Sequence, residues 1–254
     1  MTDGLAGVVL AAGEGRRLRP LTRLLPKALC PVGNVALVDQ ALARARSVTP
    51  AVAVNAHHGR RQIEEHLAAT GAGVHLSIEE PEALGTAGAL GCLRDWIDGR
   101  PVLVVNADGW HRADLRALAA GWDGERTRLL TVRDAARGTW GDRRYVGAGL
   151  LPWSEVCRFP ATPSGLWELS WRHLEPGIDL ELVSHEGPFY DCGTPADYLA
   201  ANLEASGGRT VVGEGAVVDG GAEECVLWPG TRVGPDEHLW RAIRAREDVT
   251  VLVR

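Results

Sequence analysis

The first half of the chain alternates short apolar runs with helical patterns, and this alternation limits the fold more than any other feature. The run at residues 5–12 ends in a segment rich in glycine and arginine, as expected for a buried strand that feeds a loop. Similar runs follow at 51–55, 74–78 and 101–106, with helical patterns between and after them at 38–47, 61–69 and 87–97. This spacing predicts an α/β fold, a Rossmann-like and mostly parallel sheet with helices on both faces. Functional residues are then expected at the carboxyl ends of the strands.

The pattern weakens after residue 121 and returns near residue 194. Strands are expected at 129–132 and 145–151, and the segment between them has a loop-like composition. Thr194, Pro195 and Asp197 have the types and spacing of an N-cap, a first-turn proline and a capping-box acid, which predicts a helix from 195 to about 205. We expect one domain over residues 1–206.

Residues 210–254 have a different texture. Apolar and glycine residues recur six positions apart, as in Val211 and Val217 or Ala216 and Ala222, which is typical of hexapeptide repeats. The segment is predicted to be a short left-handed parallel β-helix of two or three coils, because residues 223–229 interrupt the repeat. Ordinary strands rich in glycine and valine are the alternative. So short a stack leaves apolar coil ends, and we expect a homo-oligomer through this tail.

Composition excludes several classes of protein. With 254 residues, 45% of them hydrophobic, the chain can bury a core without disulfides. It has no apolar run long enough to span a membrane, and an acid near its start argues against a signal peptide. The net charge of −6, without a basic block, argues against a nucleic-acid partner. Five scattered cysteines fit reduced thiols, so we expect a cytoplasmic protein.

The loop after the first strand has the composition of a phosphate-binding loop. Gly13 and Gly15 permit close backbone approach, so that consecutive N–H groups could surround a triphosphate. Arg17, Arg19 and Lys27 follow as cationic donors. Lys27 is the only lysine of the chain beside 26 arginines. Because the two side chains differ in shape and hydration, the survival of one lysine here indicates a specific role.

Several motifs together resemble those of the sugar-1-phosphate nucleotidyltransferases. They are GEGRRLRPLT at 13–22, PK at 26–27, LGTAGAL at 84–90, VNAD at 105–108, YDCGT at 190–194 and the hexapeptide tail. Within this family the chain looks most like the mannose-1-phosphate guanylyltransferases and N-acetylmuramate-1-phosphate uridylyltransferases. The resemblance implies an enzyme that joins a nucleoside triphosphate to a sugar 1-phosphate, releases pyrophosphate and uses Mg²⁺.

The resemblance also implies catalytic roles for four residues. Arg17 matches the arginine on the triphosphate, Lys27 matches the lysine near the α-phosphate, and Asp108 and Asp191 match the metal ligands. The chemistry agrees with these types, because transfer between two phosphates brings anions together and needs neutralising charge. Mg²⁺ prefers one or two carboxylates with phosphates and waters. A regulatory relative that binds nucleotide sugars without turnover is the alternative.

The predicted nucleotide site combines two segments. Ala12, Gly13, Gly15 and Arg17 come from the first loop, and Gly85 and Thr86 open a helix whose amides could face the nucleotide. Capping of that helix by Thr86 is the alternative, and it is compatible with binding. Glu80, five residues before Gly85, could accept from the ring N–H and amino group of guanine, which favours GTP over UTP or dTTP. Glu79, Glu80 and Glu82 could equally be solvated loop charges.

One expected feature is absent from the sequence. Many relatives carry a further lysine that holds the sugar phosphate, and this chain has none. Arg133, Arg143 or Arg144 could replace it, because arginine binds phosphate with two parallel hydrogen bonds.

Overall fold

The computed structural model describes residues 4–253, which form two compact units. The first unit holds the described residues up to 13 together with 38–107 and 111–188. The second holds 14–37, 108–110 and the described residues from 189 onward. Segments distant in the sequence therefore fold together, and residues 14–37 belong to the same unit as the tail.

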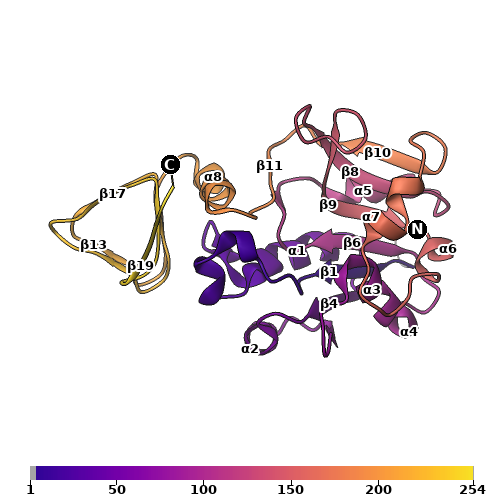
Figure 1. Cartoon of the computed structure of the whole chain (residues 1–254), viewed down its shortest axis with the longest axis horizontal. Helices are drawn as coiled ribbons and strands as arrows, with labels where there is room; N and C mark the ends of the chain where they lie inside the picture. The colour runs from indigo at the N-terminus through magenta and orange to yellow at the C-terminus, as the bar shows by residue number, and fades with distance from the viewer. Residues whose placement is uncertain (1–3, 254) are drawn as a thin grey trace. The chain divides into compact units, whose positions relative to one another are not determined.

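A seven-stranded sheet forms the centre of the first unit (Figure 1). Its order is β10-β8-β9-β6-β1-β4-β5, and β9 alone runs antiparallel to its two neighbours. The mixed α/β fold with a mostly parallel sheet is thus confirmed. The strands are β1 (Ala6–Leu10), β4 (Val52–Ala56), β5 (His75–Ile78), β6 (Val102–Asn106), β8 (Thr127–Arg133), β9 (Arg143–Leu151) and β10 (Leu180–Ser184). Strand β10 had no predicted counterpart.

Helices accompany this sheet much as expected. Leu103, Val104 and Val105 of β6 are all fully buried, so both faces of the sheet centre are covered. The helix expected over 87–97 is divided at Leu93. None of the helices within residues 4–253 is long and apolar enough to cross a membrane. The helices are α1 (Leu37–Arg46), α2 (Arg60–Ala69), α3 (Gly85–Cys92), α4 (Arg94–Ile97), α5 (Leu115–Ala119), α6 (Trp153–Val156), α7 (Leu166–Leu169) and the 3-10 helix η4 (Trp171–His173).

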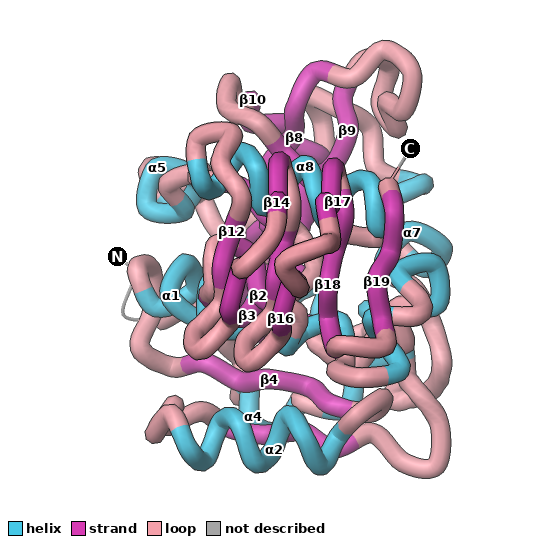
Figure 2. The backbone as a smooth tube through the Cα atoms, turned by 90° about the vertical axis from the view of Figure 1, so that its left-hand side faces the viewer, coloured by secondary structure: helices cyan, strands magenta, loops and turns pink. Residues whose placement is uncertain are grey.

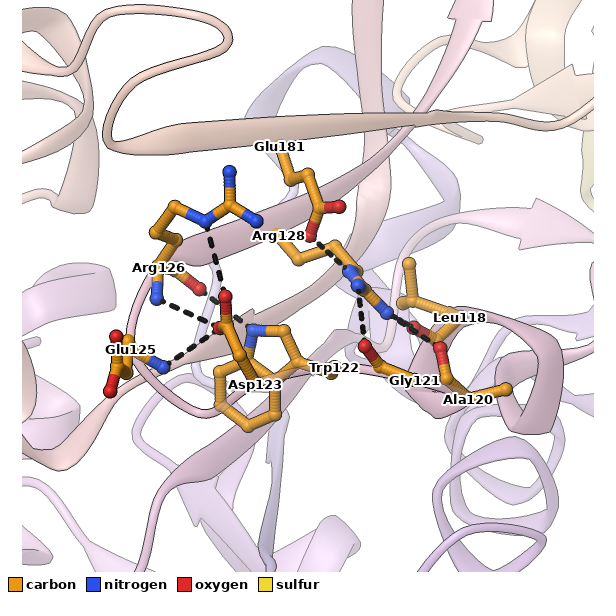
Figure 3. A network of polar contacts seen from close by, with 9 residues as sticks. All are labelled: Leu118, Ala120, Gly121, Trp122, Asp123, Glu125, Arg126, Arg128 and Glu181. Carbon is orange, nitrogen blue, oxygen red and sulfur yellow. Dashed lines mark hydrogen bonds and ion pairs between the residues drawn. The ribbon is translucent and has the colours of Figure 1, made fainter.

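A buried arginine joins β8, β10 and the end of α5. Figure 3 shows the guanidinium of Arg128 directed at the main-chain carbonyl oxygens of Leu118, Ala120 and Gly121, to which it donates at 3.0, 2.9 and 3.3 Å. Its Nε also donates to a carboxylate oxygen of Glu181 at 2.6 Å. Arg128 is only 8% exposed, so its charge is compensated by these contacts rather than by water.

The second unit begins with three short 3-10 helices and a hairpin, and its long helix follows much later in the chain. These elements are η1 (Arg16–Leu18), η2 (Leu21–Arg23), η3 (Lys27–Leu29), β2 (Pro31–Val32), β3 (Val35–Ala36), β11 (Phe189–Tyr190) and α8 (Pro195–Ser206). Strand β7 (Trp110–His111) pairs with β11, and its first residue belongs to this unit. Thr194 caps α8 as predicted: its hydroxyl oxygen accepts from the amide of Asp197 at 3.1 Å, and its O–H donates to the Asp197 carboxylate at 2.8 Å.

The tail consists of short strands that pair mostly in parallel. Val211 pairs with Val226, and Val226 pairs with Ile243, so the chain returns to the same side after fifteen and then seventeen residues. The strands enclose a triangular outline in Figure 1 and run side by side in Figure 2. An antiparallel strand ends the stack. The strands are β12 (Val211–Val212), β13 (Val217–Val218), β14 (Gly221–Glu223), β15 (Val226–Leu227), β16 (Arg232–Val233), β17 (His238–Trp240), β18 (Ala242–Arg246) and β19 (Val249–Leu252).

Tyr198 of α8 connects the tail to the loop that contains Lys27. Its hydroxyl donates to the main-chain oxygen of Pro31 and accepts from the indole N–H of Trp228 at 3.0 Å. Nearby, the side-chain oxygen of Asn202 accepts from the amide of Gly33 at 3.0 Å. The segment 14–37 is therefore held by α8 and the tail within one core.

Candidate active site

Lys27 lies between the two aspartates that the sequence predicted to act together. Its ammonium donates to a carboxylate oxygen of Asp108 at 2.8 Å and to the main-chain oxygen of Asp191 at 2.9 Å. Lys27 is 7% exposed, whereas the Asp108 side chain is 47% exposed. The charge pair is thus buried on the lysine side and open on the aspartate side. Three residues that are distant in the sequence meet at this point of the second unit.

Arg17 approaches the same place. A Cβ atom added to Gly193 would lie 2.8 Å from a terminal nitrogen of Arg17 and 2.9 Å from a carboxylate oxygen of Asp191. That oxygen accepts from the Gly193 amide at 2.8 Å. Arg17, Lys27 and Asp191 therefore surround one small volume, and a side chain at position 193 would intrude on it.

Gly15 is required by the local geometry of the loop. Its φ of +65° is in the left-handed region, and an added Cβ would lie 2.8 Å from the Thr22 methyl and 3.0 Å from Cβ of Lys27. The Thr22 hydroxyl donates to the main-chain oxygen of Gly15 at 2.9 Å. The turn can therefore close on Lys27 only without a side chain at this position.

Two thiols lie close to Lys27 but are chemically inert. Burial raises the pKa of Cys30 to about 12 and raises the pKa of Cys192 as well, although the positive charge of Lys27 lowers both in part. Both groups stay protonated near neutral pH, so neither supplies a thiolate nucleophile.

The donor set fits a magnesium ion that is completed by its substrate. Within residues 4–253 there is no group of three or more His, Cys, Asp or Glu side chains arranged to hold a metal ion by themselves. A carboxylate oxygen of Asp108 and the main-chain oxygen of Asp191 both accept from the Lys27 ammonium, and the Asp191 carboxylate lies next to Arg17 at Gly193. Mg²⁺ commonly binds one or two carboxylates and fills its other positions with phosphate and water oxygens. These residues suit such a site and do not suit a closed site of four protein ligands.

The first unit contributes the other predicted segments. Ala12 and Gly13 follow β1, and Ala12 is buried whereas Gly13 is exposed. An added Cβ at Gly13 would meet nothing within 4 Å. Packing therefore does not demand glycine at position 13, unlike position 15.

The segment of Gly85 and Thr86 packs closely against the segment near Ser164. Leu84, not Thr86, is the N-cap of α3, and the Thr86 hydroxyl oxygen accepts from the Leu166 amide at 2.8 Å instead. The amides of Ala87 and Gly88 bind the main-chain oxygen of Ser164. An added Cβ at Gly85 would lie 2.6 Å from that oxygen. Close packing of α3 on the segment near Ser164 accounts for these small residues, and the alternative of a Thr86 cap is wrong.

Glu80 and its neighbour Glu79 have opposite environments. Glu80 is exposed and pairs with Arg60 of α2. Glu79 is 1% exposed, and its carboxylate accepts from the Asn55 side chain and the Leu84 amide. The alternative of a solvated loop charge is therefore wrong for Glu79, and its buried contacts were not predicted from the sequence. Its position directly after the end of strand β5 was the available signal.

Comparisons with known proteins identify relatives of this chain by sequence. Residues 6–133 match the family described as nucleotidyl transferase. The N-acetylmuramate alpha-1-phosphate uridylyltransferase of Caulobacter vibrioides is 42% identical over 228 residues, which cover 76% of this chain and 94% of that protein. The mannose-1-phosphate guanyltransferase of Debaryomyces hansenii is 36% identical over 111 residues, which cover 41% of this chain and 30% of that protein.

Solved structures share the fold at lower identity. The inositol-1-phosphate CTP transferase of T. maritima superposes with a TM-score of 0.65 at 15% identity, over 82% of this chain and 98% of that one. The UDP-glucose pyrophosphorylase of Acinetobacter baumanii gives a TM-score of 0.61 at 15% identity, over 78% and 92%. At such identity the likeness concerns the fold alone.

Proposed function

We propose, since the chain belongs to the nucleotidyl transferase family and is a sugar-1-phosphate nucleotidyltransferase, that it transfers a uridylyl group from UTP to N-acetylmuramate 1-phosphate and releases pyrophosphate. The observation that carries the chemistry is the position of the Lys27 ammonium between the Asp108 carboxylate and the main-chain oxygen of Asp191, at 2.8 and 2.9 Å.

Each site residue has a distinct task in this transfer. A phosphate oxygen of the sugar 1-phosphate attacks the α-phosphorus of the nucleotide, and the bond from that phosphorus to the departing pyrophosphate breaks. Lys27 neutralises charge on the α-phosphate, and Arg17 holds the triphosphate. Gly15 and the amides of its loop bind the phosphates from the other side. These groups act by positioning and by charge, without a covalent intermediate on the protein.

A divalent metal completes the charge balance. We assign Mg²⁺ to Asp108 and Asp191, which would hold the ion against the phosphates. The ion supplies positive charge for the triphosphate and its leaving group. Lys27 keeps the Asp108 carboxylate oriented before substrate binds, because their ion pair is already formed.

Two observations favour UTP over the GTP that the sequence suggested. The preference for GTP relied on a Glu80 carboxylate available to guanine, and that carboxylate pairs with Arg60. The uridylyltransferase of Caulobacter vibrioides matches 76% of this chain, against 41% for the guanyltransferase of Debaryomyces hansenii. GTP with mannose 1-phosphate remains the second candidate. The other nucleotide-binding contacts are assigned to Ala12, Gly13, Gly85 and Thr86.

Arg133 is the best placed of the three arginines that could hold the sugar phosphate. It ends β8 and is exposed, and β8 runs parallel to β6, so it lies at the carboxyl edge of the sheet. Arg144 pairs with Asp134 at 3.2 Å, and Arg143 donates to the Ser184 hydroxyl. Arg133 therefore replaces the lysine that many relatives carry.

A panel of substrates tests the transfer. Pyrophosphate release is expected to be fastest with UTP and N-acetylmuramate 1-phosphate, slower with GTP and mannose 1-phosphate, and undetectable after EDTA treatment until Mg²⁺ is restored. A coupled phosphate assay with UTP, GTP, dTTP, CTP and ATP would measure these rates. No release with any pair, while a nucleotide sugar still binds, would indicate the regulatory role instead.

The tail is proposed to be a short left-handed parallel β-helix that joins two copies of the chain. Val212, Val217 and Val218 of its first coil are each at least 40% exposed. A second copy of the chain could cover them. Domain limits of 1–206 and 210–254 remain part of this proposal. Light scattering at micromolar concentration is expected to give a dimer or larger, and Val217→Asp is expected to give a monomer. A monomeric wild type would contradict the assignment.

A further inference from the structure

A chain of three hydrogen bonds, two of them buried and the third part-buried, links the carboxyl ends of β1, β4 and β5. The Asn55 side-chain oxygen accepts from the Ala11 amide at 2.7 Å, and its amide nitrogen donates to one carboxylate oxygen of Glu79 at 2.7 Å. The other Glu79 oxygen accepts from the Leu84 amide, also at 2.7 Å. This series of hydrogen bonds thus runs from the end of β1 through β4 and the end of β5 to the residue before Gly85.

Because Asn55 and Glu79 are buried, their polar groups need hydrogen-bond partners within the protein. Asn55 is 3% exposed and Glu79 is 1% exposed, and no salt bridge to Glu79 is found within residues 4–253. A buried carboxylate must therefore be compensated by its two N–H donors. The orientation of the Asn55 amide follows from chemistry, because only this orientation puts its oxygen on an N–H and its NH₂ on a carboxylate.

The two ends of this series of hydrogen bonds lie next to the two proposed nucleotide-binding segments. Ala11 precedes Ala12 and Gly13, and Leu84 precedes Gly85 and Thr86. The main-chain oxygen of Glu79 also contacts Nδ1 of His57 at 2.9 Å, so the Glu79 backbone is held from the β4 side as well. Any shift of Glu79 would change the spacing between the exit of β1 and the start of α3.

We propose that Glu79, acting through Asn55, is a positioning residue that fixes the spacing of the two nucleotide-binding segments and thereby sets the affinity for the nucleoside triphosphate. The inference rests on the proposed function, since it takes Ala12, Gly13, Gly85 and Thr86 as nucleotide contacts. Glu79 itself does not touch the substrate, because both of its carboxylate oxygens bind groups of the protein.

An exchange of the two side-chain types tests this role. In Asn55→Asp with Glu79→Gln, the new aspartate can accept from the Ala11 amide and from the glutamine NH₂, and the glutamine oxygen can accept from the Leu84 amide. All three hydrogen bonds are retained with the same total charge and nearly the same volume. Glu79→Gln alone opposes two NH₂ groups or leaves the Leu84 amide unpaired, and Asn55→Asp alone opposes two buried carboxylates.

We expect the variants to weaken binding of the nucleotide selectively. Each single variant should raise KM for the triphosphate about 10-fold or more with little change in KM for the sugar 1-phosphate. The double variant should return to within about 3-fold of wild type. Hydrogen exchange of the Ala11 and Leu84 amides should accelerate in the single variants and recover in the double variant. Glu82→Gln, an exposed carboxylate of the same loop, serves as the matched control and should leave both KM values unchanged.

Three outcomes would overturn the proposal. One is a double variant that folds but stays as impaired as the single variants. The second is a set of single variants that raise both KM values equally, as a general loss of structure would. The third is single variants that match wild type. If the wild-type protein is inactive but binds a triphosphate, the proposed transfer reaction is wrong. The role of Glu79 can then still be tested, by comparing the dissociation constants of the variants for the triphosphate instead of their KM values. A wild type that binds no triphosphate would overturn both.

Discussion

Replacing Lys27 by arginine is expected to lower kcat at least 100-fold, although the charge is kept and 26 arginines occur elsewhere in the chain. Lys27 is 7% exposed, and its ammonium fits between the Asp108 carboxylate and the Asp191 main chain. A planar guanidinium is wider than an ammonium and cannot make both contacts from the same stem. Lys27→Ala should lose about 10³-fold, the size expected when one donor to the reacting phosphate is removed.

Steady-state pyrophosphate release and thermal melting should be measured on the same samples. Arg16→Ala is the matched control, because Arg16 belongs to the same loop but its side chain is 77% exposed and pairs with Glu14 at the surface. It should keep kcat within about 3-fold of wild type. If Lys27→Arg is as active as Arg16→Ala while both remain folded, Lys27 does not act on the phosphate.

The sequence predicted the sheet well because its strands have a simple local signature. The runs at 5–12, 51–55 and 101–106 became β1, β4 and β6 with ends shifted by at most two residues. Each is a short apolar run that ends in a loop, and burial on both faces requires no more than that. Strand β10 was missed because Glu181 interrupts its apolar pattern. The structure explains this charge, since Glu181 pairs with the buried Arg128.

The candidate site was predicted only in part, and there is a physical reason why some of its residues could be predicted and others could not. The meeting of Lys27, Asp108 and Asp191 could be expected from the motifs, because each motif states a residue type that phosphate chemistry needs. The tasks of Glu79 and Glu80 could not, because neighbouring residues of one type differ only in the direction of their side chains. Which of the two was buried depended on Asn55 and Leu84, whose positions are set by the whole sheet.

Replacing Arg128 by methionine is expected to destabilise the first unit by about 3 kcal/mol. The side chain is 8% exposed and satisfies three main-chain carbonyl oxygens and Glu181 (Figure 3). Methionine fills much of the volume but donates no hydrogen bond, so the carbonyl oxygens at the end of α5 lose their partner. For a chain of this size, such a loss lowers Tm by about 10 °C. Thermal unfolding followed by circular dichroism would measure it.

Arg126→Ala separates the effect of burial from that of charge. Arg126 lies two residues away and pairs with Asp123, but both side chains are about 40% exposed, so water replaces the lost contact and Tm should fall by less than about 2 °C. The Tm of Arg128→Lys should lie between those of Arg128→Met and Arg126→Ala, because one ammonium cannot reach three carbonyl oxygens and a carboxylate at once. Equal Tm values for Arg128→Met and Arg126→Ala would mean that the carbonyl oxygens are hydrated when Arg128 is removed. In that case Arg128 would orient α5 without stabilising it, and the buried charge would be neutral in free energy, as buried ion pairs often are when their desolvation is counted.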